Sequence, residues 1–292
     1  MTLISADPIA PTAIRPRKLA RRMLSNPAGM IGGCIVLALV ICAVFAPQIA
    51  PFAPTRMGAG RPILAPSWAH LAGTDEFGRD MFSRIVYGAR FTLLTGAIAV
   101  GISLVVGLSI GLIAAFMRGW VEIVLMRLSD VLFSFTETLI ALACVAVLGP
   151  SLQNAMIAVG IAGIPLYART AYAAALVEVG KPYFEGSIVA GASPQRLILT
   201  HLLPNVLPTM IVIATLGLSS AILAAAGLSF LGLGAQPPTP EWGAMLSGGR
   251  DFFNRAPWLM LYPGLAIAIV VLGFNLLGDG LRQIIDPKGG DR

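Results

Sequence analysis

Long apolar runs without charged residues decide most of what this chain can fold into. Residues 91–117 contain no Asp, Glu, Lys or Arg, and residues 256–278 are also uncharged. An α-helix needs about 20 mostly apolar residues to cross the roughly 30 Å hydrocarbon core of a bilayer. Hydrophobic residues make up 57% of the chain and charged residues only 12%, against about 25% charged residues in soluble domains. We therefore predict an all-α membrane protein rather than a soluble, disordered or disulfide-stapled chain.

Six runs of this kind predict six transmembrane helices, with both termini on the same side of the bilayer. The first run, residues 28–46, follows a basic segment at residues 1–27 and is too long for the apolar part of a cleaved signal peptide, which is the alternative reading. Residues 47–90 form an outer loop whose first part is extended or turned, because its dense prolines oppose a regular helix. The other five spans lie in a core at residues 91–282, followed by a tail at residues 283–292. These spans are residues 91–117, 131–148, 152–167 (a shorter run that continues past Arg169 to residue 177), 206–233 and 256–278.

Lysine and arginine counts predict the orientation, because cytoplasmic loops carry an excess of these residues. With the N-terminus inside, 13 of them lie on the inner side, Arg127 and Arg169 among them, and 7 lie on the outer side. This balance favours an N-in, C-in protein. The net charge of +6 has the same origin, because the basic residues stand at segment ends and form no stripe with aromatic residues. We therefore expect no nucleic-acid partner.

The sequence offers little for catalysis or metal binding. Cys34, Cys42 and Cys144 lie inside apolar runs, where they act as small buried hydrophobes. The two histidines, His70 and His201, are far apart in the sequence. The chain also lacks a G-x-x-x-x-G-K-[ST] phosphate loop. We expect no catalytic residue, no metal site, no cofactor and no ATP hydrolysis by this chain alone.

Two glycine spacings favour helix packing instead of chemistry. Gly107, Ser109 and Gly111 match the nucleophile elbow of hydrolases, but they lie inside an uncharged span with no histidine or acid nearby. Small residues four apart let helices approach closely in lipid. Gly29 and Gly33 repeat that spacing in the first span.

The inner segment at residues 183–205 predicts a helix, a turn and a second helix. Glu185 belongs to a short helix that Gly191 ends, because glycine adopts a positive φ at little cost. Ser193 is the expected N-cap of the second helix, with Pro194 at its first position. One face of that helix can dock into a partner's groove or lie on lipid headgroups, and the residue pattern favours neither. The side chains on this face are Leu197, Ile198, His201 and Leu202.

The same segment resembles the EAA loop of ABC importer permeases, in which Glu-Ala-Ala is followed at fixed distances by Gly and by Leu-Pro. His201 stands where many members have isoleucine, and Gly186-Ser187 replaces the two alanines. In that family the loop is the coupling helix, which sits in a cleft of the ATPase subunit. The ATPase-coupling residues that the resemblance implies are Glu185, Gly191, Ala192, Ser193, Pro194, His201, Leu203 and Pro204.

Further segments are similar to one branch of these importers, the dipeptide, oligopeptide and nickel permeases, and to the smaller of its two paired permease types. They follow one another across nearly the whole chain. The segments are residues 73–90, 147–151, 167–169, 227–234, 240–243, 274–282 and 286–287. The resemblance implies the type I ABC importer permease fold, with cytoplasmic coupling helices, in the bacterial inner membrane.

The resemblance also implies partners and a mechanism. A second, different permease completes a heterodimer, two ATPase subunits hold ATP and Mg, and an extracytoplasmic binding protein delivers the solute. Closure of the ATPases moves the coupling helices and opens the spans outward. Dipeptides, longer peptides, glutathione-like compounds, opines and nickel are all substrates of this branch, and the sequence is compatible with each.

Glu137 is the one acidic residue well inside an apolar run, where a charge must face protein or water. It is either a pore-facing contact for a peptide's amino group or a cation, or a carboxylate near the inner interface that pairs with Arg127 or stays protonated. In the outer loop, a cluster of opposite charges predicts a solvated, salt-bridged face, with contact to the binding protein as the alternative. This cluster is Asp75, Glu76, Arg79, Asp80 and Arg84.

Two other function classes fit the sequence less well. A membrane-embedded enzyme requires clusters of intramembrane catalytic groups, and only Glu137 is present. A secondary transporter that works alone predicts inverted repeats and several buried titratable groups, and the sequence has neither.

Overall fold

A computed structural model of the chain describes residues 26–285, so most of the predicted N-terminal segment and of the C-terminal tail lies outside the described residues. Within residues 26–285 the chain forms helices and turns, with one isolated β-bridge between Thr74 and Asp80 and no strand. The elements are α2 (Pro27–Val44), α3 (Ala46–Ile49), α4 (Met81–Met117), α5 (Gly119–Phe133), α6 (Glu137–Leu148), α7 (Leu152–Val179), α8 (Pro182–Val189), α9 (Pro194–Arg196), the π-helical η1 (Leu197–Leu202), α10 (Leu203–Phe230), α11 (Trp242–Gly249), the 3-10 helix η2 (Arg250–Phe252) and α12 (Trp258–Ile285).

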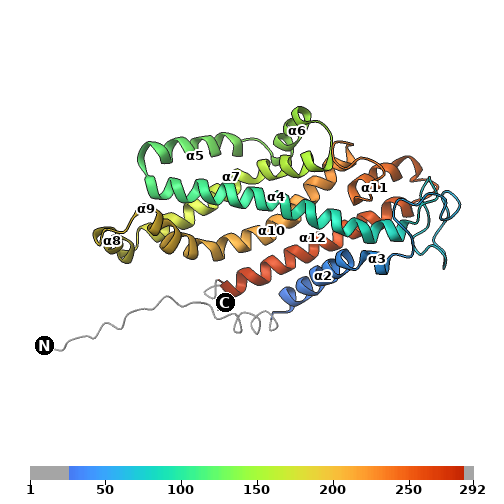
Figure 1. Cartoon of the computed structure of the whole chain (residues 1–292), viewed down its shortest axis with the longest axis horizontal. Helices are drawn as coiled ribbons and strands as arrows, with labels where there is room; N and C mark the ends of the chain where they lie inside the picture. The colour runs from blue at the N-terminus through green and yellow to red at the C-terminus, as the bar shows by residue number, and fades with distance from the viewer. Residues whose placement is uncertain (1–25, 286–292) are drawn as a thin grey trace.

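The long helices run along the long axis of the molecule, as Figure 1 shows. Among residues 26–285, five helices are long and apolar enough to cross a membrane, and the α5–α6 pair makes a sixth if it counts as one broken span. Helices α8 and α9 stand at one end of this bundle, and α11 stands near the other end (Figure 1). The predicted all-α membrane fold is confirmed.

The third predicted span, residues 131–148, is wrong as one straight helix. It covers the end of α5, a break, and α6, and the two helices meet at an angle of 92°. At the break the Ser134 hydroxyl donates to the carbonyl of Val131 over 2.6 Å, and Thr136 is extended. Short polar side chains offer the backbone such alternatives to helical hydrogen bonds. Helix α5 also begins earlier than the predicted span, at Gly119, so Arg127 lies inside a helix rather than in a loop.

Two other predicted boundaries also shift. Arg169, which the orientation argument placed in an inner loop, lies inside the continuous helix α7. The outer loop ends at residue 80 rather than 90, because α4 begins at Met81. Asp80 caps this helix by accepting a hydrogen bond from the Ser83 amide over 2.8 Å.

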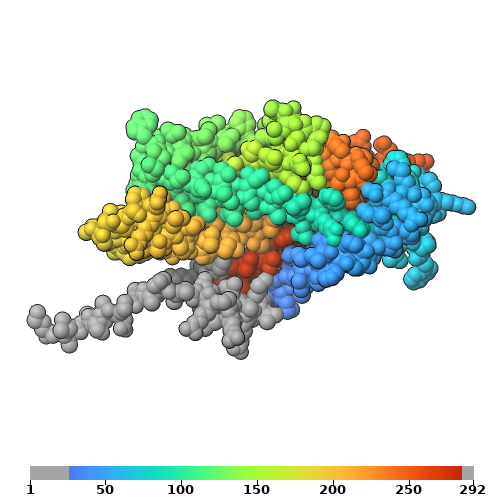
Figure 2. Space-filling view, viewed as in Figure 1, coloured from blue at the N-terminus to red at the C-terminus, as the bar shows by residue number. Residues whose placement is uncertain are grey.

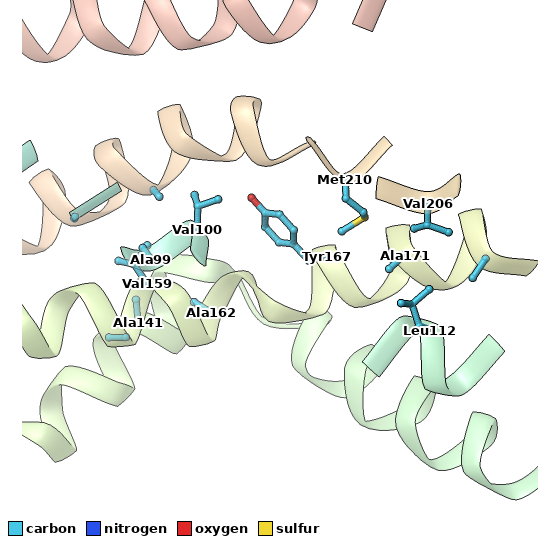
Figure 3. Packing of buried hydrophobic residues seen from close by; sticks show 14 of the residues in the cluster. Ala99, Val100, Leu112, Ala141, Val159, Ala162, Tyr167, Ala171, Val206 and Met210 are labelled. Carbon is cyan, nitrogen blue, oxygen red and sulfur yellow. The ribbon is translucent and has the colours of Figure 1, made fainter. Parts of the chain in front are cut away.

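Helices α4 and α7 form the most extensive helix pair of the described residues, and glycine permits their approach. A Cβ at Gly107 would lie 2.8 Å from the backbone nitrogen of Ala168, and one at Gly111 would lie 2.6 Å from the Ala168 carbonyl oxygen. The packing prediction for this glycine pair is confirmed. Buried side chains next to this contact include Leu112 and Ala171, which Figure 3 shows on facing helices.

The first span packs against α12 through a glycine that sequence spacing did not identify. A Cβ at Gly32 would lie 2.4 Å from the backbone nitrogen of Leu277. Gly280 approaches Gly29 equally closely, because a Cβ added at Gly280 would be 2.5 Å from the Gly29 Cα. Gly29 and Gly32 therefore face the helix contact, and Gly33, predicted in that role, is only partly buried. Of the two glycines predicted from their spacing, Gly29 lies at the contact with α12, and Gly32 takes the place predicted for Gly33.

The outer charge cluster is salt-bridged as predicted, but it is not a solvated face. Arg79 pairs with Asp75 over 2.5 Å, and both side chains are 5% exposed. Arg84 is also buried, and its guanidinium donates to the carbonyls of Pro54 and Pro238. This arginine therefore joins the outer loop to the segment before α11. The buried ion pairs fix the fold of the outer end of the molecule.

Candidate functional site

The segment at residues 183–205 folds as a helix, a turn and a second helix. Gly191 has a φ of 78° directly after α8, and the positive φ reverses the chain direction. The Ser193 side chain then accepts a hydrogen bond from the Arg196 amide over 3.4 Å, with Pro194 in the first turn of α9. The local predictions for the turn glycine and the N-cap are confirmed.

The predicted apolar face of the second helix is not free to bind a partner. Leu197 is 3% exposed and Leu202 is fully buried, and both belong to the main core cluster of the bundle. Helix α9, the π-helical η1 and α10 follow one another without a break, so Pro204 lies inside a continuous helical segment rather than at a loop end. This face anchors the segment to the protein's own core.

The surface that the segment does present comes from α8 and the turn after it. Ile188 is 51% exposed and Val189 is 88% exposed, while Glu185 lies on the same exposed helix. Phe184 is 1% exposed and packs in the main core cluster, which fixes α8 to the bundle. In the space-filling view this region forms the yellow projection at the left end of the molecule (Figure 2).

Tyr183 joins three helices at the base of this projection, a role that sequence analysis missed. Its hydroxyl donates to Glu178 at the end of α7 over 2.7 Å and accepts from the Asn205 side chain of α10 over 3.3 Å. Its ring lies 6.0 Å from the His201 ring. Burial and the hydrogen bond to Glu178 raise the pKa of Tyr183 to about 12, so the hydroxyl remains a donor. The sequence feature that could have indicated this role is an aromatic residue, Tyr183, two positions before Glu185.

The structure distributes the predicted coupling residues over two groups. The first group surrounds the exposed turn, and the second lies at the base, where α10 begins. The turn group is Glu185, Gly191, Ala192, Ser193 and Pro194, and the base group is His201, Leu203 and Pro204.

Glu137 lines a cavity of about 280 Å³ that also includes residues of α4, α7, α10 and α12. The Tyr167 hydroxyl is buried in this wall and has no hydrogen-bond partner within residues 26–285. Figure 3 shows its oxygen directed away from its own helix, toward α10. Arg127, the alternative partner for Glu137, lines a different cavity. The arrangement places Glu137 beside an open space rather than in an ion pair with Arg127.

A second cavity, of about 540 Å³, lies between α5 and α7. Arg169 Nη1 is 2.9 Å from Asp130 Oδ1, and the Tyr172 hydroxyl donates to Glu122. Sequence analysis treated Arg169 as a loop residue and missed this polar group. The signal was present, because the apolar run before Arg169 continues beyond it to residue 177.

Comparisons with known proteins give one consistent result. Residues 107–289 match the family described as "Binding-protein-dependent transport system inner membrane component", and residues 16–66 match the "N-terminal TM domain of oligopeptide transport permease C". The dipeptide transport system permease protein DppC of Alkalihalophilus pseudofirmus is 42% identical over 98% of this chain and 96% of its own. The same-named protein of Escherichia coli K12 is 45% identical over 90% of each chain.

Two further similarities complete the comparison. The glutathione transport system permease protein GsiD of Pectobacterium atrosepticum is 40% identical over 93% of this chain and 91% of its own. Among solved structures, an inward-facing conformation of the MetNI methionine ABC transporter matches with a TM-score of 0.58 and 21% identity. That match covers 70% of this chain and 97% of the other. At this identity the structural match establishes the fold alone.

Proposed function

Because the chain belongs to the binding-protein-dependent transport system inner membrane components, a family of permease subunits in the bacterial inner membrane, we propose that its residues 183–205 couple solute import to ATPase subunits. The chain is a permease and not an enzyme. ATP and Mg are held by two partner ATPases, a second, different permease completes a heterodimer, and an extracytoplasmic binding protein delivers the solute.

The observation that carries this proposal is the projection formed by α8 and the turn after it. It stands at one end of the helix bundle and exposes two aliphatic side chains, Ile188 and Val189, beside the carboxylate of Glu185. An exposed apolar patch with a charged rim is a typical docking surface for a partner protein. This end of the molecule is the cytoplasmic end in the predicted orientation, where the ATPases reside.

The anchoring of α8 explains how a partner's movement reaches the transmembrane helices. Phe184 is buried in the same core cluster as Leu112 of α4, Ala171 of α7 and Met210 of α10. Tightly packed interiors transmit displacement instead of absorbing it. When the ATPases close on ATP, the two coupling segments of the heterodimer move together and the helices rearrange toward the outward-open state. Hydrolysis then resets them.

Peptides are the proposed substrates, with Glu137 as one contact for a peptide's amino group along the path. Its support is the cavity that Glu137 shares with the Tyr167 hydroxyl, which has no hydrogen-bond partner in the part of the chain that the structure describes. Glutathione-like compounds are the alternative that a relative's name favours, and opines or nickel are further alternatives. Selectivity resides largely in the binding protein, so binding measurements on that partner distinguish these classes.

The coupling role is tested by reversing charge on the projection. The complete importer, with Glu185→Arg in this chain, is purified and assayed for bound ATPase subunits and for ATP-driven uptake into vesicles. We expect both to be lost. The matched control is Asp251→Arg, a reversal at a side chain that is 85% exposed on η2, and it retains both. If Glu185→Arg retains ATPase subunits and uptake, the coupling surface lies elsewhere.

The role of Glu137 is tested separately with Glu137→Gln, which keeps the size of the side chain. We expect altered peptide uptake by a complex that assembles normally. Unchanged transport by this variant removes Glu137 from the path.

A further inference from the structure

The cavity between α5 and α7 is lined by four charged side chains, two of which, Asp130 and Arg169, stand well inside their helices. Arg169 is about 15 Å from the end of α7 at Val179, because ten residues of about 1.5 Å rise separate them. Asp130 lies similarly far along α5, which begins at the same end of the molecule. Glu122 and Arg127 line the same cavity. Ionisable groups inside membrane spans are costly, so they face protein or water.

The ion pair in this cavity is not sealed within the chain. The Arg169 side chain is 52% exposed and the Asp130 side chain is 39% exposed, although their atoms are 2.9 Å apart. Two such charges against lipid tails would be strongly unfavourable. Their exposure indicates that this side of the α5–α7 pair faces a water-containing space, and the 540 Å³ cavity provides one within the chain itself.

The charges in the cavity are balanced. Two carboxylates, Glu122 and Asp130, stand with two guanidinium groups, Arg127 and Arg169. A site for a divalent cation would have an excess of carboxylates, and a site for an anion would have an excess of arginines. Equal numbers of both match a solute that carries one positive and one negative group. Free peptides are such zwitterions at neutral pH, with an α-ammonium and an α-carboxylate.

We propose that the α5–α7 cavity is a binding site for a zwitterionic solute on its way through the membrane. The Asp130–Arg169 ion pair opens to accept it: Arg169 binds the solute's carboxylate and Asp130 binds its ammonium group. One internal ion pair is thereby exchanged for two ion pairs with the solute. This inference rests on the proposed import function and extends it to solute recognition by this chain.

The spacing of the charged side chains along α5 also allows the solute to pass from one set of partners to the next. Glu122 and Asp130 are two helical turns apart, about 12 Å along the axis, and Arg127 lies between them in the sequence. A dipeptide spans at most about 7 Å, so it reaches one set of partners at a time. The Tyr172 hydroxyl holds Glu122 while Asp130 is engaged, and can release it for the solute's next position.

The test compares neutral variants of the ion pair in the complete importer. We expect Arg169→Gln, Asp130→Asn and the double variant each to reduce dipeptide uptake per ATP hydrolysed at least tenfold. ATPase stimulation by the loaded binding protein persists, because the coupling segment is intact. Arg250→Gln, which removes an exposed arginine on η2, is the matched control with unchanged uptake.

The double variant distinguishes binding from structure. An ion pair that only supports the fold is harmed most when one charge is left unpaired, so a structural role predicts near-normal uptake when both charges are removed. Normal uptake per ATP in the double variant, or in both single variants, overturns the binding site. Absence of ATP-driven uptake in the unaltered importer refutes the proposed function itself, which separates the two failures.

Discussion

The glycine contact between α4 and α7 gives the sharpest prediction about what holds the bundle together. A Cβ at Gly111 would lie 2.6 Å from the Ala168 carbonyl oxygen, 2.6 Å from the Ala171 Cβ and 2.7 Å from the Tyr172 nitrogen. Ordinary contacts begin near 3.4 Å, so the helices must separate by several tenths of an ångström. Two of the three atoms are backbone and cannot rotate away. Overpacking of this kind costs about 1–3 kcal/mol.

A second glycine on the same helix supplies the control. A Cβ at Gly101 meets nothing within 4 Å, so Gly101→Ala adds only the helix propensity of alanine, up to about 1 kcal/mol in favour of the fold. The assay is the thermal unfolding midpoint of the purified complex in detergent. We expect Gly111→Ala to lower it by several degrees and Gly101→Ala to leave it unchanged or raise it. Equal shifts for both variants would refute the close-contact reasoning.

Three further outcomes follow from the structure. Gly191→Ala forces alanine into a positive φ at a cost of about 1–2 kcal/mol, and it should reduce ATP-driven uptake about fivefold or more. Gly191→Asn should retain most of the uptake, because asparagine tolerates a positive φ. Tyr183→Phe removes two hydrogen bonds, including that to Glu178, at about 0.5–1.5 kcal/mol each; uptake per ATP should fall severalfold while the complex still assembles. Burial raises the pKa of Glu241 above its ordinary value of 4.5. The protonated carboxyl group therefore contributes its full stabilisation below the ordinary pKa, and this contribution declines as the pH rises through the raised pKa. Glu241→Gln should remove this decline when thermal midpoints are compared between acidic and neutral pH.

Features set by neighbouring residues could be predicted from the sequence. The Ser193 cap, the Gly191 turn and the Gly107–Gly111 contact each depend on residues a few positions apart, and all three are present. Local spacing carries such information because capping, positive φ and helical periodicity are decided within one or two turns.

Features set by distant contacts could not be predicted in this way. Arg84 can be buried because the carbonyls of Pro54 and Pro238 accept hydrogen bonds from its guanidinium group. No local sequence pattern predicts partners that lie so far apart in the chain. Gly32 rather than Gly33 faces α12 because the orientation of α2 is fixed by its neighbour. The pairing of Asp130 with Arg169 likewise depends on the break after α5, which orients that helix against α7.

The central claim is that the projection at α8 receives its motion from an ATPase in the cytoplasm. Photo-crosslinking from position 189, whose valine is 88% exposed, tests it most directly in membranes that contain the complete importer. We expect a photoreactive residue at this position to crosslink to an ATPase subunit, with a yield that changes when ATP is added. Crosslinks only to lipid or to the extracytoplasmic binding protein would contradict it.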